Sequence, residues 1–297
     1  MTTKKTLQAF IVQSCLSIAV ISIMVDVSFA QIQYAAAKQL CELEERDIGE
    51  SSGLIASVRH PGIFWTHNDS GHDPKLYAFD RQGKHLGTCK VDKATCEDWE
   101  DIASMQINGQ SYLVVGDVGD NVKKRAACRL YFIPEPKTPK DESKAEYRLD
   151  FTYDAGPIDC EAIAYDAQQH QIILVEKIML GVSSRVYAVP LPTVLTKKMA
   201  ASAKLIGRIP VVMTTGMDIS TDGLRMVIGT YGPGYEFQRQ PEQSWQEVFT
   251  KPGRIISLPQ RRQGEAICYG SDGRTLYLTS EKKPTPLFEI SPIQEIK

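Results

Sequence analysis

The segment Glu161-Ala162-Ile163-Ala164-Tyr165 (EAIAY) decides the fold, because four other segments repeat its short apolar pattern around a central aliphatic residue. They are SGLIA at 52–56, EDIAS at 100–104, MDIST at 217–221 and EAICY at 265–269. The central aliphatic residues are 48, 61, 56 and 48 positions apart. Internal similarity at a period of about fifty residues is typical of propellers and other repeat architectures.

A turn and further apolar runs follow each of these segments. The turns at Asp222-Gly223 and Asp272-Gly273 indicate hairpins, because glycine tolerates the positive φ of a tight turn. Runs such as IILV at 172–175 and RVYAV at 185–189 supply further strands. Four strands per repeat in a closed ring form a β-propeller. The sequence therefore predicts an all-β propeller of four-stranded blades, five in number, or six if residues 232–263 contain another.

The last repeat has no fourth apolar run after Ile290. The segment QLCEL at 39–43 precedes the first repeat, and we expect this N-terminal strand to pair there and close the ring. An open blade edge would expose unpaired backbone donors and acceptors. A two-sheet sandwich is the competing architecture, but it does not predict the period of the repeat.

The first thirty residues are typical of a secretory signal peptide. Lys4 and Lys5 precede a largely apolar run at 7–25, and small residues at Ser28 and Ala30 suit cleavage. An uncleaved membrane anchor is the alternative, because the run is nearly long enough to span a bilayer. We therefore expect a single propeller domain at 31–297, periplasmic or secreted, with no membrane contact once the signal is cleaved. The oligomeric state stays open.

Six cysteines follow the signal segment, an even number that would permit disulfides in an oxidising compartment. Cys89 and Cys96 are close enough in sequence to close a small loop, and six small buried thiols are the alternative. The chain has no Cys-x-x-Cys, so neither a zinc knuckle nor a thioredoxin-type pair is indicated.

Composition excludes several classes of protein. The 36 acidic and 34 basic residues are too evenly balanced for a nucleic-acid protein held by a basic patch, and a hydrophobic content of 42% excludes a disordered chain. The sequence has no Gly-x-Ser-x-Gly, His-Glu-x-x-His or P-loop motif. We expect the tryptophans, at positions 65, 99 and 245, to pack between blades.

The strings DWEDIA at 98–103, GDVGDN at 116–121 and QGEAI at 263–267 resemble those of an uncharacterised family of secreted bacterial β-propeller proteins. That resemblance covers nearly all of the chain after the signal and implies a propeller fold and export, without an established reaction. The chain is more distantly similar to the phytase-like propellers, whose channel-lining Glu-Gly-Ile-Ala segments help to bind calcium and phosphate. Here alanine or aspartate replaces that glycine, which puts phytase activity in doubt.

The innermost strand of each propeller blade lines the central channel, so the repeated segments should face one another. Their carboxylates occupy adjacent register positions, and Glu50 precedes the first segment slightly out of register. The predicted metal ligands are Glu100, Asp101, Glu161, Asp218 and Glu265. Converging carboxylates need protons, basic partners or a cation, and oxygen ligands alone suit Ca²⁺ better than zinc. The alternative is that they accept backbone N–H groups and brace the ring.

The ends of the second strands supply further polar groups that could lie together at one mouth of the channel. As ligand-binding candidates they are Asn68, Asp69, Asp117, Asp120, Asn121, Tyr231 and Glu281. As catalytic candidates they are His67, Glu176, Lys177 and Lys282. Each has an ordinary explanation in turn chemistry or ion pairing, and it is their repetition at matching positions that favours a functional role.

Two hypotheses of function follow. The first is a binding or scaffold protein that presents loops around an acidic, cation-holding channel to a small-molecule or protein ligand. The second is a calcium-dependent hydrolase of a phosphoester or lactone, with His67 or Glu176 as base and Lys177 or Lys282 stabilising negative charge. Fold alone does not decide between them.

Overall fold

The structure, a computed structural model, describes residues 31–293. The predicted signal peptide at 1–30 therefore lies outside the described residues. Regular structure in the described part is almost entirely β-strand, with one short helix, α1 (Trp245–Val248). None of the helices in residues 31–293 has the length and apolar character needed to cross a membrane.

The strands form sets of four that follow one another along the chain, and neighbours within a set are antiparallel. The sets are β2 (Ser51–Ala56), β3 (Ile63–Asn68), β4 (Lys75–Asp80) and β5 (His85–Asp92); β6 (Trp99–Ile107), β7 (Gln110–Asp117), β8 (Cys128–Pro134) and β10 (Tyr147–Tyr153); β11 (Cys160–Asp166), β12 (Gln171–Glu176), β13 (Ser184–Pro190) and β14 (Lys198–Ile209); β15 (Thr214–Ile219), β16 (Arg225–Thr230), β17 (Gly234–Gln238) and β18 (Arg254–Ile256); and β19 (Ile267–Tyr269), β20 (Leu276–Leu278) and β21 (Pro286–Ile290) with β1 (Lys38–Glu42).

Two parallel pairings connect neighbouring sets at the outer edge. β10 pairs with β14, which joins two sets into one eight-stranded sheet, and the two-residue strand β9 (Ser143–Lys144) pairs with β5. β1 pairs antiparallel with β21, with Lys38 opposite Glu289 and Glu42 opposite Pro286. The N-terminal strand thus lies where the sequence predicts it, beside the last strand of the chain.

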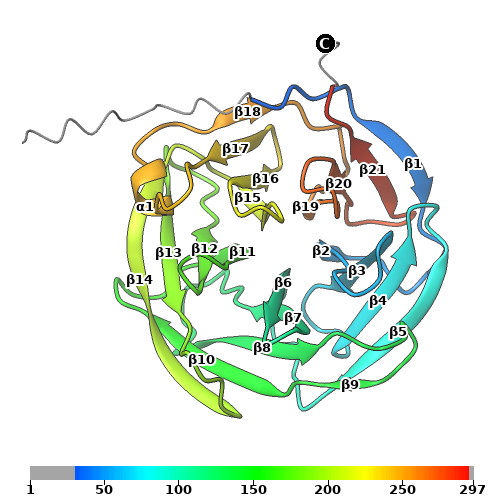
Figure 1. The fold of residues 1–297 in the computed structure, drawn as a ribbon, viewed down its shortest axis with the longest axis horizontal. Coiled ribbons are helices and arrows are strands. Elements are labelled where there is room, and N and C mark those ends of the chain that lie inside the picture. Colours follow the sequence, from blue (N-terminus) through cyan, green and yellow to red (C-terminus); the bar gives the residue numbers. More distant parts are fainter. Residues whose placement is uncertain (1–30, 294–297) are drawn as a thin grey trace, which may run out of the picture. The chain divides into compact units, whose positions relative to one another are not determined.

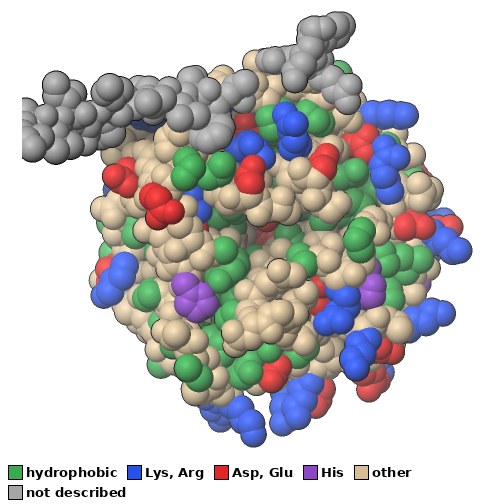
Figure 2. Space-filling model, viewed as in Figure 1, with side chains coloured by type: hydrophobic (Ala, Val, Ile, Leu, Met, Phe, Trp, Pro, Cys, Tyr) green, Lys and Arg blue, Asp and Glu red, His purple; other side chains and the backbone are tan. Residues whose placement is uncertain are grey.

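The sets radiate around a central axis, and the first strand of each, namely β2, β6, β11, β15 and β19, lies nearest that axis (Figure 1). These strands are buried because each contacts the next around the axis. The hydrophobic core lies between adjacent sets, where Trp65, Trp99 and Trp245 are fully buried, as the sequence predicts. On the face seen in Figure 2, charged side chains gather toward the outer edge, over β4, β5 and β9, and uncharged groups surround the centre.

The Asp-Gly turns form as the sequence predicts. Gly223 and Gly273 have φ of +72° and +62°, in the left-handed region that favours glycine. The side chain of Asp222 accepts a hydrogen bond from Leu224 N at 3.0 Å, and Asp272 accepts one from Arg274 N at 2.9 Å. In these two sets the first strand, β15 or β19, therefore returns sharply into the second, β16 or β20.

The structure bears on two points that the sequence left open. The stretch 232–263 supplies β17 and β18, which pair in the sheet of β15, with α1 between them. The expected Cys89–Cys96 disulfide is wrong, because all six cysteines of the described residues are unbridged thiols. Cys89 lies buried on β5 within the core, and Cys96 lies on the loop before β6.

Candidate functional site

Asp101 on the inner strand β6 ties neighbouring strands together. Its carboxylate accepts hydrogen bonds from the backbone N–H of Ile102 (2.9 Å), of Ile163 on β11 (2.8 Å) and of Met217 on β15 (3.1 Å). The side chain is fully buried, and burial raises its pKa well above the usual range, although the three N–H donors oppose that shift. Asp101 therefore has the bracing geometry that the sequence left open as the alternative to metal binding.

Asp218 on β15 has a similar arrangement two inner strands further around the axis. It accepts a hydrogen bond from Ile219 N at 2.8 Å and one from Tyr269 N on β19 at 2.9 Å. Burial raises its pKa to about 7, against the effect of these donors. Both aspartates point their oxygens at backbone amides, so neither contributes to the cluster described next.

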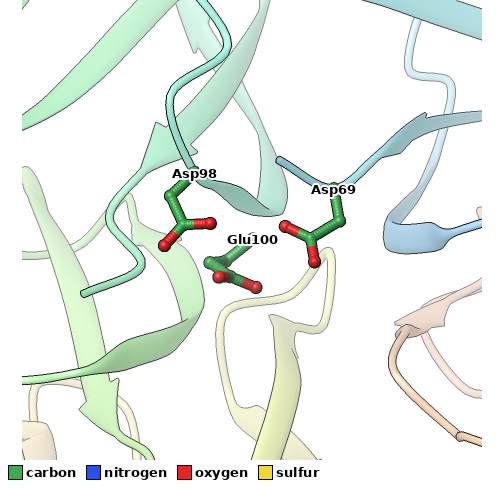
Figure 3. Close-up of side chains that lie close together, drawn as sticks. All are labelled: Asp69, Asp98 and Glu100. Atoms are coloured by element: carbon green, nitrogen blue, oxygen red, sulfur yellow. The ribbon is translucent and has the colours of Figure 1, made fainter. Parts of the chain in front are cut away.

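Three carboxylates converge at one end of the axis, and we name them the acidic cluster: Asp69, Asp98 and Glu100. One oxygen of each lies within 4.8 Å of the others. Asp69 follows β3, Asp98 immediately precedes β6, and Glu100 is the second residue of β6. Figure 3 shows the carboxyl groups of Asp69 and Asp98 on either side of Glu100.

Burial and mutual repulsion destabilise the ionised carboxylates of the acidic cluster. Burial raises the pKa of Asp98 to about 6, with Asp69 adding to the shift and Arg125 opposing it. Burial also raises the pKa of Glu100 well above its usual range, and Glu161 and Asp69 raise it further. Like charges brought together in a desolvated site stabilise either a bound proton or a bound cation.

The chain at Gly119 presses directly against the acidic cluster. The backbone N–H of Gly119 donates to the carbonyl of Asp98 at 3.2 Å. A Cβ at this position would collide with Glu100 Oε1 and Asp98 Oδ2, and would lie 2.6 Å from Asp98 Cγ. Only glycine leaves room for the two carboxyl groups to lie as close together as they do.

A second group of side chains continues from the acidic cluster across the axis. Lys177 forms an ion pair with Glu161 at 2.8 Å, and its ammonium lies 5.1 Å from the ring centre of Tyr231. The Tyr231 hydroxyl donates to Glu265 Oε1 at 2.7 Å, whereas the buried Oε2 of Glu265 has no hydrogen-bond partner among the described residues. Burial raises the pKa of Glu161 to about 7 despite Lys177. Burial would lower the pKa of Lys177, but Glu161 raises it above its usual range.

Glu281 completes this end of the axis. Burial raises its pKa to about 7, with the nearby Glu265 and Asp69 contributing. Lys282 lies 3.7 Å from it, with its side chain more than half exposed. The structure thus brings together Glu100, Glu161, Glu265, Asp69, Tyr231, Lys177 and Glu281 from the residues that the sequence singled out.

His67 and Asn68 have structural partners instead. His67 is completely buried, its Nδ1 lies 3.0 Å from the carbonyl of Asn68, and its ring packs edge-on against Trp99. Burial lowers its pKa to about 4. The Asn68 side chain accepts from the backbone N–H of Gly49 and Glu50 and donates to a carbonyl, which holds the loop before β2.

Most of the other residues predicted from the sequence form ion pairs or hydrogen bonds with the loops at the end of the axis that carries the acidic cluster. Asp117 pairs with Arg125 at 2.8 Å, and Asp120 accepts two backbone N–H groups of its own loop. Glu176 binds Arg185 through both oxygens, and Arg185 lowers its pKa against the effect of burial. Asn121 is exposed on the same loop as Asp120. A catalytic base at Glu176 would have to break this paired arrangement.

The opposite end of the axis has a different character. A cavity of about 350 Å³ lies there, at the far ends of the inner strands, with Ser57, Ser104 and Ser220 in its lining. Asp218 also lines it, with its carboxylate bonded to backbone N–H groups as described above. The concentration of carboxylates is therefore a property of one end only.

Asp98 is the one member of the acidic cluster that is not among the candidate residues predicted from the sequence. It lies two residues before the repeated segment EDIAS, and Glu50 and Asp159 occupy the same register in two other repeats. An acidic residue two positions before the repeated segment was therefore the available signal.

No protein-family model matches the chain, and no curated protein sequence matches it. Among solved structures, the glutaminyl cyclase of Myxococcus xanthus is similar to the chain with a TM-score of 0.52 and 10% identity, over 89% of this chain and 100% of that one. A nidogen/laminin complex gives a TM-score of 0.45 and 10% identity, over 78% and 73%. The fold is a β-propeller. At this identity the likeness concerns the fold alone.

Proposed function

We propose that this propeller binds a divalent cation, with Ca²⁺ as the first candidate, at the acidic cluster of Asp69, Asp98 and Glu100. The observation that carries the proposal is the convergence of three carboxylate oxygens within 4.8 Å, on two different segments of chain. Ca²⁺ takes six to eight oxygen ligands, so three carboxylates leave positions for water or for oxygens of a ligand. On this basis the protein acts as a ligand-binding or scaffold protein, whose cation helps to hold a ligand at the mouth.

The surroundings of the acidic cluster support a cation there. Asp69 and Asp98 are half-buried and Glu100 is buried, so a bound ion would be reachable from solvent on one side. Glycine at position 119 keeps two of the carboxylates close, although their charges repel. Ion binding would offset that repulsion, because it replaces a proton with a stronger counter-charge.

Calorimetric titration of the chelator-treated protein with CaCl2 tests the proposal. Wild type should bind saturably, and Asp98→Asn and Glu100→Gln should each weaken binding by about tenfold or more. Asp73→Asn is the matched control, because Asp73 lies on the same loop as Asp69 but its side chain is 75% exposed and paired with Lys75. Absence of binding in wild type, or equal losses in the control, would contradict the proposal.

A second candidate function is a calcium-dependent hydrolase of a phosphoester or lactone. The observation that favours it is Glu161, whose pKa near 7 suits proton transfer at neutral pH and which lies between Lys177 and the acidic cluster. In this scheme Glu161 replaces His67 and Glu176 as the acid–base group, because those two side chains are engaged elsewhere. Glu161→Gln should abolish turnover of such esters while Ca²⁺ binding persists, and turnover that survives the change would exclude this role.

The proposal includes the finer architecture and the compartment. Five blades, the last completed by β1, would enclose the axis, as the sets of four strands and the β1–β21 pairing support. Residues 1–30 would direct export to the periplasm or the medium, with cleavage after Ala30. The intact mass of the protein recovered from cell fractions tests this, since uncleaved protein in the membrane fraction would favour the anchor instead.

A further inference from the structure

Several large apolar side chains are exposed on loops beside the acidic cluster, and we name them the apolar lip: Val122, Met179, Leu180 and Val182. Their exposed fractions are 70%, 57%, 93% and 86%. Val122 lies on the loop between β7 and β8, and the other three lie between β12 and β13. Isolated exposed apolar residues are common, but several on adjacent loops indicate a contact surface.

The two loops of the apolar lip are held together at their base. Lys123 forms an ion pair with Glu176 at 3.3 Å, which connects the residue next to Val122 to the end of β12. Asp159 accepts the backbone N–H of Asp120 through its side chain at 3.0 Å and that of Lys177 through its carbonyl at 2.8 Å. The loops therefore start from a common anchor, and the lip borders the ion pair of Lys177 and Glu161.

Exposed basic residues lie on two loops of this end. Lys123 and Lys124 follow Val122 directly, whereas Lys282 and Lys283 lie on the loop between β20 and β21, in a different set of strands. The neighbouring exposed acid Glu97 is paired with Arg125 and Arg129. No ion pair of Lys124 or Lys283 is found within residues 31–293. Apolar tips flanked by lysines are complementary to an anionic bilayer surface, where the tips enter the headgroup region and the lysines meet lipid phosphates.

We propose that this end of the propeller docks on anionic lipid membranes through the apolar lip and the adjacent Lys123 and Lys124. The inference goes beyond the proposed cation binding and does not depend on it. It also requires no membrane-spanning segment, because surface docking uses loop tips alone. The acidic cluster would then face the membrane surface.

Co-sedimentation with vesicles tests the proposal, with the purified protein in chelator so that the outcome is independent of Ca²⁺. Wild type should sediment with vesicles of phosphatidylcholine and phosphatidylglycerol, and much less with phosphatidylcholine alone. Leu180→Ser should weaken binding about tenfold, because it removes an exposed leucine side chain that would be buried in the headgroup region on docking. Lys124→Gln should weaken it about fivefold.

Ile255→Ser is the matched control, because Ile255 is 67% exposed on the outer strand β18, away from the lip. Its binding should equal that of wild type. Three results would each overturn the proposal: no sedimentation of wild type with the anionic vesicles, equal loss in Leu180→Ser and Ile255→Ser, or equal binding to both kinds of vesicle. The first would direct attention to a protein partner for the lip.

Discussion

Substitution of Gly119 by alanine tests the acidic cluster without altering any charge. The added methyl group would lie 2.6 Å from Asp98 Cγ, whereas carbon atoms in contact are separated by about 3.5–4.0 Å. The two carboxyl groups must therefore move by about 1 Å. Overpacking of this kind costs about 1–3 kcal/mol of stability, which corresponds to a fall in melting temperature of about 2–12 °C.

The decisive readout is the effect of Ca²⁺ on that melting temperature. At a hundred times its dissociation constant, Ca²⁺ should stabilise wild type by about 2.7 kcal/mol. Gly119→Ala should need about 10–100-fold more Ca²⁺ for the same stabilisation, because its ligands are displaced. Gly232→Ala is the control, since a Cβ there meets only Thr230 Oγ1 at an ordinary 3.6 Å. If Gly119→Ala responds to Ca²⁺ as wild type and the Gly232→Ala control do, the assignment of the site to these carboxylates is refuted.

Three further predictions concern the rest of the structure. In chelator, the free energy of unfolding should fall as the pH rises from about 4 to about 7. The pKa values of Asp98 (about 6), Glu161 and Glu281 (both about 7) are raised, so the folded state binds more protons than the unfolded state over this range. Urea unfolding across that range measures the free energy, and a stability that rises with pH would contradict the burial of these groups. Asp101→Ala should destabilise by about 3–6 kcal/mol, because three buried N–H groups lose their acceptor. Asp73→Ala, at an exposed surface pair, should leave stability unchanged in the same denaturant assay. A chain that begins at Leu43 lacks β1 and leaves the edge of β21 unpaired, so it should unfold at lower denaturant and associate in size-exclusion chromatography; a stable, monomeric product would show that β1 is dispensable.

Much of the fold follows from local pattern in the sequence. The apolar segments at 161–165 and 265–269 contribute to the inner strands β11 and β19, and the Asp-Gly turns form with positive φ. The pairing of β1 with β21 also follows, because the last repeat lacks an outer strand and the first is preceded by one. The parallel pairing of β10 with β14 does not follow, since it depends on how far β14 extends past its own sheet.

The site is less predictable, because it depends on the direction in which each carboxylate points. Glu100 and Asp101 are adjacent, yet one faces the acidic cluster and the other accepts backbone N–H groups of two other inner strands, because successive residues of a strand face opposite sides. His67 on β3 and Glu176 on β12 matched their counterparts by position, but their partners, Trp99 and Arg185, lie on other strands. Such contacts between strands leave no pattern in one sequence.

A cation at the acidic cluster should change the melting temperature of the purified protein, measured first in chelator and then with increasing CaCl2. We expect a saturable rise that Asp98→Asn reduces and Asp73→Asn leaves intact. No rise in wild type, in a protein that also carries no tightly bound metal as isolated, would contradict a cation at Asp69, Asp98 and Glu100 and would leave protons as the only counter-charge of the acidic cluster.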